Sequence, residues 1–288
     1  MIFNSSPLAA EFWQRGYSDD CPIIDFHGHM NEIGCGYLPR CRPENMLKSM
    51  DAHNVKMLLF CSHTALMAPA LATEMDKKVV EMYPDRFRAY YALNANTTDI
   101  KREFKHFQDN IHIYAGIKML PDYFKRPIND PTYERFYDLC NDQKLLFLCH
   151  TWDNPPSIYN GPTQAEEFLK KYPAVTFIAG HSFHPNWKQA CRLCNTYPNL
   201  YLELTAVLDE RGPLEQLLAS CGSQKLLFGT DLPWFNSLHG IGTILSTNMS
   251  DDDRKNIFFR NGNRILSKYL WFKDLTIHAS KARLSSIC

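Results

Sequence analysis

Short apolar stretches alternate with longer amphipathic stretches along most of the chain. The apolar stretches are rich in β-branched, aromatic and leucine residues, a composition that favours strands. We expect eight strands, at residues 22–29, 55–63, 87–96, 111–120, 144–151, 175–182, 199–206 and 225–232. The intervening stretches are predicted to be mostly helical, as in PTYERFYDLCNDQ (131–143) and PTQAEEFLKKYP (162–173).

This alternation of strands and helices indicates a parallel sheet built from βαβ units. Eight such units that close on themselves form a (β/α)8 TIM barrel, an α/β fold. An open doubly wound sheet is the alternative, but no G-x-G-x-x-G motif follows the first strand. The length of 288 residues suits one domain over residues 1–288. We expect a core at about 22–266, a leading segment at 1–20 packed on the barrel and a C-terminal appendage at 267–288.

Composition and charge narrow the range of partners. The formal net charge is zero, and no run of basic residues indicates a nucleic-acid or anionic membrane surface. No apolar run is long enough to span a bilayer. Polar and charged residues interrupt the N-terminal segment too early for a signal peptide. We therefore expect a soluble cytoplasmic protein with a small-molecule substrate and no nucleic-acid or membrane partner.

The chain contains ten cysteines, but it is not a short secreted scaffold. Cys61 and Cys149 lie inside apolar strand-like stretches, where a thiol behaves as a small buried hydrophobic group. Cys191 and Cys194 form a C-x-x-C pair, but no second pair exists and both lie in a predicted helix. We interpret them as two ordinary cysteines in a reducing compartment.

Two histidines are placed one residue apart in the first predicted strand, PIIDFHGHM. Successive strand residues point to opposite faces, so Asp25, His27 and His29 share one face. Two neighbouring imidazoles are well suited to bind one metal ion. Two hydrogen-bonded structural histidines at a strand end are the alternative from this stretch alone.

Later strands supply further polar residues at the same end. In a TIM barrel the active site forms at the C-terminal ends of the strands. Each residue has a structural alternative, such as a snorkelling lysine or an aspartate cap. Their coincidence at one rim favours a metal site, because buried unpaired ionisable groups are costly. The strand-end residues are His27, His29, Lys118, His150, His181 and Asp231.

Six segments of the chain resemble the amidohydrolase superfamily in their order and spacing: IDFHGH, AGIKMLP, LCHTW, IAGHSF, LLFGTDLPW and RNGNRIL. The resemblance covers roughly residues 22–266. The most similar branch is the amidohydrolase-related one, which includes ester and lactone hydrolases. It also includes non-oxidative decarboxylases such as aminocarboxymuconate semialdehyde decarboxylase. The motif combination is specific to the superfamily and much less specific to a reaction.

The resemblance implies roles for the strand-end residues. Metal ligation falls to His27, His29, His150 and Asp231. The resemblance implies a catalytic role for His181, and Asp231 would also handle the proton of a bound water. Two-metal members carry a carboxylated lysine near the place of Lys118, but we expect one metal, with a second bridged by Lys118 as the alternative. Zinc is the default for this N/O donor set, with Mn²⁺, Fe²⁺ and Co²⁺ as competitors.

Loops after the strands are expected to set substrate specificity. An arginine after the first strand could clamp a substrate carboxylate, although solvated surface arginines are equally consistent with the sequence. Aromatic residues after later strands would wall a pocket for a small cyclic or aromatic substrate, or simply pack the loops. The substrate-binding candidates are Tyr37, Arg40, Arg42, Trp152 and Trp234.

The sequence thus predicts a metal-dependent hydrolase that acts on a small carboxylate-bearing lactone, ester or amide through a metal-activated water. The first alternative is a metal-dependent, non-oxidative decarboxylase of a small cyclic or aromatic acid. The second is a metal-holding binding protein without turnover. The sequence leaves the oligomeric state open, and a homodimer is compatible with it.

Overall fold

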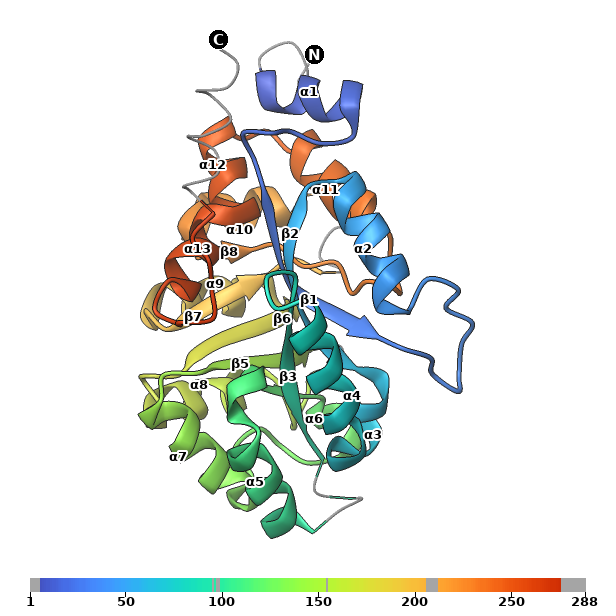
Figure 1. Ribbon diagram of the computed structural model, residues 1–288. Helices are drawn as coiled ribbons and strands as arrows, with labels where there is room; N and C mark the ends of the chain where they lie inside the picture. Colours follow the sequence, from blue (N-terminus) through green and yellow to red (C-terminus); the bar gives the residue numbers. More distant parts are fainter. Residues whose placement is uncertain (1–5, 95, 97–98, 154, 206–211, 276–288) are drawn as a thin grey trace.

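The computed structural model describes residues 6–94, 96, 99–153, 155–205 and 212–275. Eight parallel strands lie side by side in chain order, surrounded by helices (Figure 1). This confirms the predicted TIM barrel. The strands are β1 (Ile23–Met30), β2 (Val55–Ser62), β3 (Phe87–Leu93), β4 (Tyr114–Met119), β5 (Leu146–Trp152), β6 (Thr176–His184), β7 (Leu200–Glu203) and β8 (Leu226–Leu227).

Helices connect the strands and cover the outside of the barrel. Several begin with proline at the first helical turn, where its missing N–H is not needed. The α-helices are α1 (Pro7–Arg15), α2 (Pro43–Ala52), α3 (His63–Met67), α4 (Pro69–Met82), α5 (Ile100–Asp109), α6 (Pro121–Phe124), α7 (Glu134–Asp142), α8 (Pro162–Lys171), α9 (Trp187–Thr196), α10 (Pro213–Cys221), α11 (Ser237–Ser246), α12 (Asp251–Lys255) and α13 (Asn261–Leu266). Short 3₁₀ turns are η2 (Ile111–Ile113), η3 (Pro131–Tyr133) and η5 (Ser223–Lys225), and η6 (Asn256–Arg260) is a π-helical turn.

The barrel closes between β1 and the segment that follows β8. Strand β8 is shorter than the predicted strand 225–232, and Asp231 within that stretch has φ 59°, outside the extended region. Backbone hydrogen bonds nevertheless continue across the seam. The amide of Phe26 donates to Phe228 (3.0 Å), that of Asp231 to His27 (2.8 Å) and that of His29 to Leu232 (2.6 Å). These bonds hold Asp231 directly beside β1.

The ends of the described chain pack against the barrel. In α1 the side chains of Leu8 and Phe12 are buried, and the ring of Phe12 stacks on Phe258 at 5.8 Å between centroids. Phe272 and Leu275 are also buried beyond α13, whereas residues 276–288 of the predicted appendage lie outside the described residues. None of the helices in the described part of the chain is both long and apolar enough to cross a membrane.

Candidate metal centre

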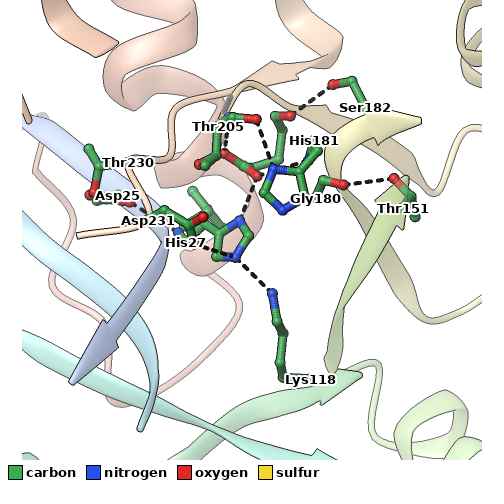
Figure 2. Close-up of polar contacts among 12 residues, drawn as sticks. Asp25, His27, Lys118, Thr151, Gly180, His181, Ser182, Thr205, Thr230 and Asp231 are labelled. Atoms are coloured by element: carbon green, nitrogen blue, oxygen red, sulfur yellow. Dashed lines mark hydrogen bonds and ion pairs between the residues drawn. The ribbon is translucent and has the colours of Figure 1, made fainter. Parts of the chain in front are cut away.

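Polar side chains from several strands meet at the C-terminal ends of the barrel strands (Figure 2). The potential ligand atoms of His27, His181 and Asp231 all lie within 4.8 Å of one another. Asp231 Oδ1 lies 3.1 Å from Nε2 of both His27 and His29, so His29 borders the same group. The topology has therefore brought together residues from β1, β6 and the end of β8.

The three imidazoles are held through their Nδ1 atoms. A carbonyl or carboxylate oxygen only accepts hydrogen bonds, so each Nδ1 carries the proton and each Nε2 keeps a lone pair. This is the arrangement that orients metal-binding histidines. The Nδ1 partners are Glu203 Oε2 at 2.8 Å for His27, the Cys61 carbonyl at 2.9 Å for His29 and the Thr205 carbonyl at 3.0 Å for His181.

Asp231 provides the test of whether these residues fit a metal ion. Its Oδ1 atom is buried and accepts no hydrogen bond, although two imidazole Nε2 atoms are close. A carboxylate oxygen that faces lone pairs needs a cation among them. The donor set of nitrogen and oxygen atoms fits a divalent transition metal.

Glu203 on β7 is a buried acidic residue that sequence analysis missed. Its Oε2 accepts from His27 Nδ1, and its Oε1 accepts from the amide of Thr205 at 2.6 Å. A side chain at Gly229 would place its Cβ 1.9 Å from Glu203 Oε1, so glycine at this position makes room for the carboxylate. The signal in the sequence is a single acidic residue inside the apolar stretch NLYLELTA.

Two strained segments present Asp231 and His181. Asp231 and the consecutive residues His181, Ser182 and Phe183 all have positive φ angles, between 52° and 66°. This conformation costs roughly 1–2 kcal/mol for each non-glycine residue. Specific bonds offset the cost in β6, since the Ser182 hydroxyl donates to the Glu203 carbonyl at 2.8 Å. Such strain is concentrated at functional sites in proteins.

Asp25 lies on the same strand as the histidines, but its hydrogen bonds stabilise the closure between β1 and the segment after β8 rather than the metal group. Its Oδ2 accepts from the Thr230 hydroxyl at 2.6 Å, and its Oδ1 accepts from the His27 amide at 3.0 Å. Thr230 Oγ1 in turn accepts from the Leu232 amide at 2.9 Å. These three bonds fix the turn that carries Asp231.

Lys118 at the end of β4 points directly at the metal group (Figure 2). Its Nζ lies 2.7 Å from His27 Nε2, and its side chain is fully buried. Burial lowers the pKa of Lys118, which makes loss of its proton easier. The lone pair of His27 Nε2 cannot serve Lys118 and a metal ion at once. The lysine must therefore turn toward another acceptor when a metal is bound.

We expect elemental analysis to find about one metal ion per chain, because the imidazoles and Asp231 suffice for a single ion. Lys118→Met should keep this ratio, since the lysine competes with a metal for His27 rather than bridging two ions. The measurement is metal content after loading with Zn²⁺ or Mn²⁺ and desalting. A ratio near two that falls to one in Lys118→Met would show a lysine-bridged pair instead.

His150, the predicted fourth ligand, lies between the metal group and a cavity. Its ring centroid is 4.6 Å from that of His181, and its Nδ1 is 3.3 Å from Asp122 Oδ1. The cavity has a volume of about 480 Å³ and is lined by Asp122, Tyr123, Lys125, His150 and Trp152. His150 is outside the group of three, and its role as a ligand stays a prediction.

The aromatic candidates for substrate binding lie near the site. Trp152 lines the cavity beside His150. Trp234 donates from Nε1 to His63 Nε2 at 3.0 Å, and the His63 ring stacks on His29 at 5.2 Å between centroids. His63 ends the predicted strand 55–63, so the strand-end rule that selected the other histidines could also have found it.

The candidates on the loop after β1 lie apart from the cavity. Tyr37 and Arg40 are exposed, and neither lines the cavity beside His150. Arg42 forms an exposed ion pair with Glu32 at 2.6 Å and lines a separate cavity of about 420 Å³ against α2 and α4. The predicted carboxylate clamp by these arginines stays a prediction, and Lys125 is a cation in the cavity itself.

Comparison with known proteins supports the fold and points to a family. A family model described as Amidohydrolase matches residues 24–267. No curated protein matches the sequence. An uncharacterised TIM-barrel protein from Bordetella bronchiseptica has a TM-score of 0.72 at 18% identity, covering 86% of this chain and 99% of that one.

Two decarboxylases have the same fold. The 2,6-dihydroxybenzoate decarboxylase from Rhizobium has a TM-score of 0.69 at 17% identity, with 86% of this chain and 99% of that chain covered. A dihydroxybenzoic acid decarboxylase from Polaromonas sp. JS666, with bound manganese and the inhibitor 2-nitroresorcinol, has a TM-score of 0.65 at 16% identity, with 86% and 97% covered. At these identities the similarity establishes a shared fold.

Proposed function

The chain belongs to the amidohydrolase family of enzymes, and from this premise we propose that it is a metal-dependent, non-oxidative decarboxylase of a small aromatic or cyclic carboxylic acid. One observation carries the proposal. Asp231 Oδ1 faces the Nε2 atoms of His27 and His29 and accepts no hydrogen bond, and a cavity with aromatic walls lies beside this group. The solved decarboxylases with the same fold support this reaction over hydrolysis.

The chemistry divides between the metal and the chain's own residues. A bound divalent cation would supply positive charge that orients the substrate carboxylate and a neighbouring oxygen. Decarboxylation replaces a carbon–carbon bond with a carbon–hydrogen bond, so a proton must reach the same carbon. Asp231 Oδ1 accepts no hydrogen bond, so this carboxylate can carry that proton from a substrate hydroxyl or a water.

The hydrogen bond and tautomer of His181 bear on its proposed role. Its Nδ1 proton is donated to the Thr205 carbonyl, which leaves Nε2 without a hydrogen. Burial, followed by the charge of His150, lowers the pKa of His181 to about 3, so the ring is neutral near pH 7. A neutral ring with this tautomer does not donate to a developing oxyanion. His181 Nε2 therefore acts as a ligand or as a proton acceptor.

The cavity beside His150 fits a planar acid. Tyr123 and Trp152 line it, and the ring of Tyr123 meets His150 edge-on at 5.6 Å between centroids. An aromatic substrate would gain stacking contacts there. Lys125 also lines this cavity, with its ammonium over the Tyr159 ring at 5.5 Å from the centroid, and it could attract a second anionic or phenolic oxygen of the substrate.

Hydrolysis of an ester or lactone by a metal-activated water is the second candidate, because the same donor set can support it. Manganese is bound in two decarboxylases of this fold, so Mn²⁺ joins Zn²⁺ as a metal to test first. The residues themselves, nitrogen and carboxylate donors, are compatible with both ions.

The test compares carbon dioxide release with ring opening or ester cleavage. Protein purified without added metal and then loaded with Mn²⁺ or Zn²⁺ is incubated with 2,6-dihydroxybenzoate, 5-carboxyvanillate, other hydroxylated aromatic acids, and a panel of lactones and esters. We expect metal-dependent release of carbon dioxide from one of the aromatic acids. Hydrolysis of a lactone or ester without carbon dioxide release, or turnover unchanged by a chelator, would contradict the proposal.

A further inference from the structure

Three cysteines meet between helices α9 and α10, away from the metal centre. Cys191 and Cys194 are three residues apart, so they lie on one side of α9. Cys221 is the last residue of α10, and its thiol lies near enough to those of Cys191 and Cys194 to shift the pKa of each. The sequence indicated two ordinary cysteines here, because the C-x-x-C spacing gives no information about Cys221.

The two helices are held together at this point. They pack side by side, as Figure 1 also shows, and Asn195 Nδ2 donates to the Ser220 carbonyl at 3.0 Å. These two residues directly adjoin Cys194 and Cys221. The cysteines therefore face one another on a fixed part of the fold, as the formation of a disulfide requires.

The exposure of the three thiols differs. Cys194 is 1% exposed and Cys191 is 8% exposed, whereas Cys221 is partly exposed. An oxidant in solution can thus reach Cys221, while the thiols of α9 are shielded. The neighbouring Cys221 thiol lowers the pKa of Cys194, an effect that burial opposes and Lys225 supports. The Cys191 thiol lowers the pKa of Cys221, but the Cys194 thiol and burial outweigh this effect and raise the pKa to about 12. A thiol that ionises more easily is the better nucleophile at neutral pH.

A structural metal fits the cluster less well. Among the described residues, the ligand atoms that gather within 4.8 Å of one another belong to His27, His181 and Asp231, and not to these cysteines. The three sulfurs do not form such a compact group, so the two cysteines of α9 are alternative disulfide partners for Cys221.

We propose that Cys191, Cys194 and Cys221 form a thiol–disulfide site, in which Cys221 forms a reversible disulfide with a cysteine of α9 when a peroxide is present. A thiolate of this site attacks the peroxide, so that a sulfur–oxygen bond forms, the oxygen–oxygen bond breaks and water or an alcohol leaves. A thiol of the other helix then attacks the oxidised sulfur, which forms the disulfide and releases water. The two thiols lose two electrons together, and the peroxide gains them.

The disulfide should leave the metal centre unchanged. Cys221 precedes η5 and β8, so it lies toward the N-terminal ends of the strands, opposite the rim that carries Asp231. That end of a TIM barrel contributes to stability rather than to catalysis. We therefore expect oxidation to raise the melting temperature, by about 5 °C or more, without loss of bound metal.

The experiment treats the full-length protein with hydrogen peroxide at neutral pH and counts free thiols after denaturation. A Cys35→Ser background is used because Cys35 is exposed and would form intermolecular disulfides. Peptide mapping by mass spectrometry identifies the linked residues. We expect a loss of two thiols per chain, a cross-linked peptide that contains Cys221, and recovery of both thiols with a dithiol.

Variants make the assignment specific. Cys191→Ser and Cys194→Ser should each keep a disulfide to Cys221 through the remaining cysteine. Cys221→Ser and the double variant of Cys191 and Cys194 should lose it, whereas Cys140→Ser, at a buried cysteine elsewhere, should behave as the parent. Circular dichroism confirms that each variant is folded. The proposal fails if Cys221 stays reduced, if it is oxidised beyond the sulfenic acid without cross-linking, or if the cross-link persists in Cys221→Ser.

Discussion

Replacing both His27 and His29 with alanine should remove the bound metal and reduce turnover by at least about a thousandfold, while the barrel stays folded. The two Nε2 atoms flank Asp231 Oδ1 at 3.1 Å, so their loss removes half of the expected donor set. A metal contributes several kcal/mol to the stabilisation of the transition state, and each 1.4 kcal/mol corresponds to a factor of ten in rate. Elemental analysis measures the metal, and circular dichroism reports the fold.

A matched control removes two imidazoles elsewhere. His106 in α5 and His112 in η2 are outside the metal group, so His106→Ala/His112→Ala should retain both metal and activity. Full metal content in His27→Ala/His29→Ala would overturn the assignment of β1 as a source of ligands. Loss of secondary structure in that variant alone would instead show that the histidines support the fold.

The same metal titration decides between His150 and His181. The sequence resemblance implies that His150 is a ligand, whereas the geometry groups His181 with His27 and Asp231. We expect His181→Ala to weaken metal binding at least as much as His150→Ala, because His181 Nε2 is the free nitrogen beside Asp231. Unchanged metal affinity in His181→Ala, together with a loss in His150→Ala, would restore the ligand set implied by the resemblance.

The second large effect is expected at Asp231. Asp231→Asn keeps the size of the side chain and one oxygen donor, but it removes the negative charge and the ability to carry a proton. We expect part of the metal to be retained and turnover to fall by about a thousandfold or more, since a positioned acid–base group contributes roughly 10² to 10⁴ and the lost charge adds to this. Single-turnover kinetics on metal-saturated protein separates the chemical step from binding.

Asp122→Asn serves as the control for this experiment. Asp122 is another carboxylate near the site, but it contacts His150 in the cavity rather than His27 or His29. Its loss should leave the metal in place and affect substrate binding more than the chemical step. If metal-saturated Asp231→Asn turns over at the parent rate, Asp231 does not carry the proton, and His181 Nε2 becomes the remaining acceptor in the group.

Local patterns in the sequence were enough to predict the architecture. Apolar strands and amphipathic helices are decided by residues close to one another in the chain, so eight βα units could be identified without knowledge of the fold. Once the barrel is assumed, its geometry places every strand end at one rim. This is why His27, His29, His181 and Asp231 could be predicted to lie together, and why Lys118 could be placed beside them.

The contacts within the site depended on tertiary structure. Glu203 and His27 are 176 residues apart in the sequence. Their contact depends on how β7, β8 and β1 are aligned in the closed barrel, which local patterns do not show. Local patterns also could not predict the turn at Asp231 or that Arg42 and Lys125 line different cavities. The sequence did not place Cys221 near the C-x-x-C pair, because that proximity depends on the packing of α9 on α10. The positions of the polar residues along the chain were enough to assign the chemistry to the C-terminal ends of the strands. Only the folded chain decided which atoms face one another there, because those distances arise from packing between segments remote in sequence.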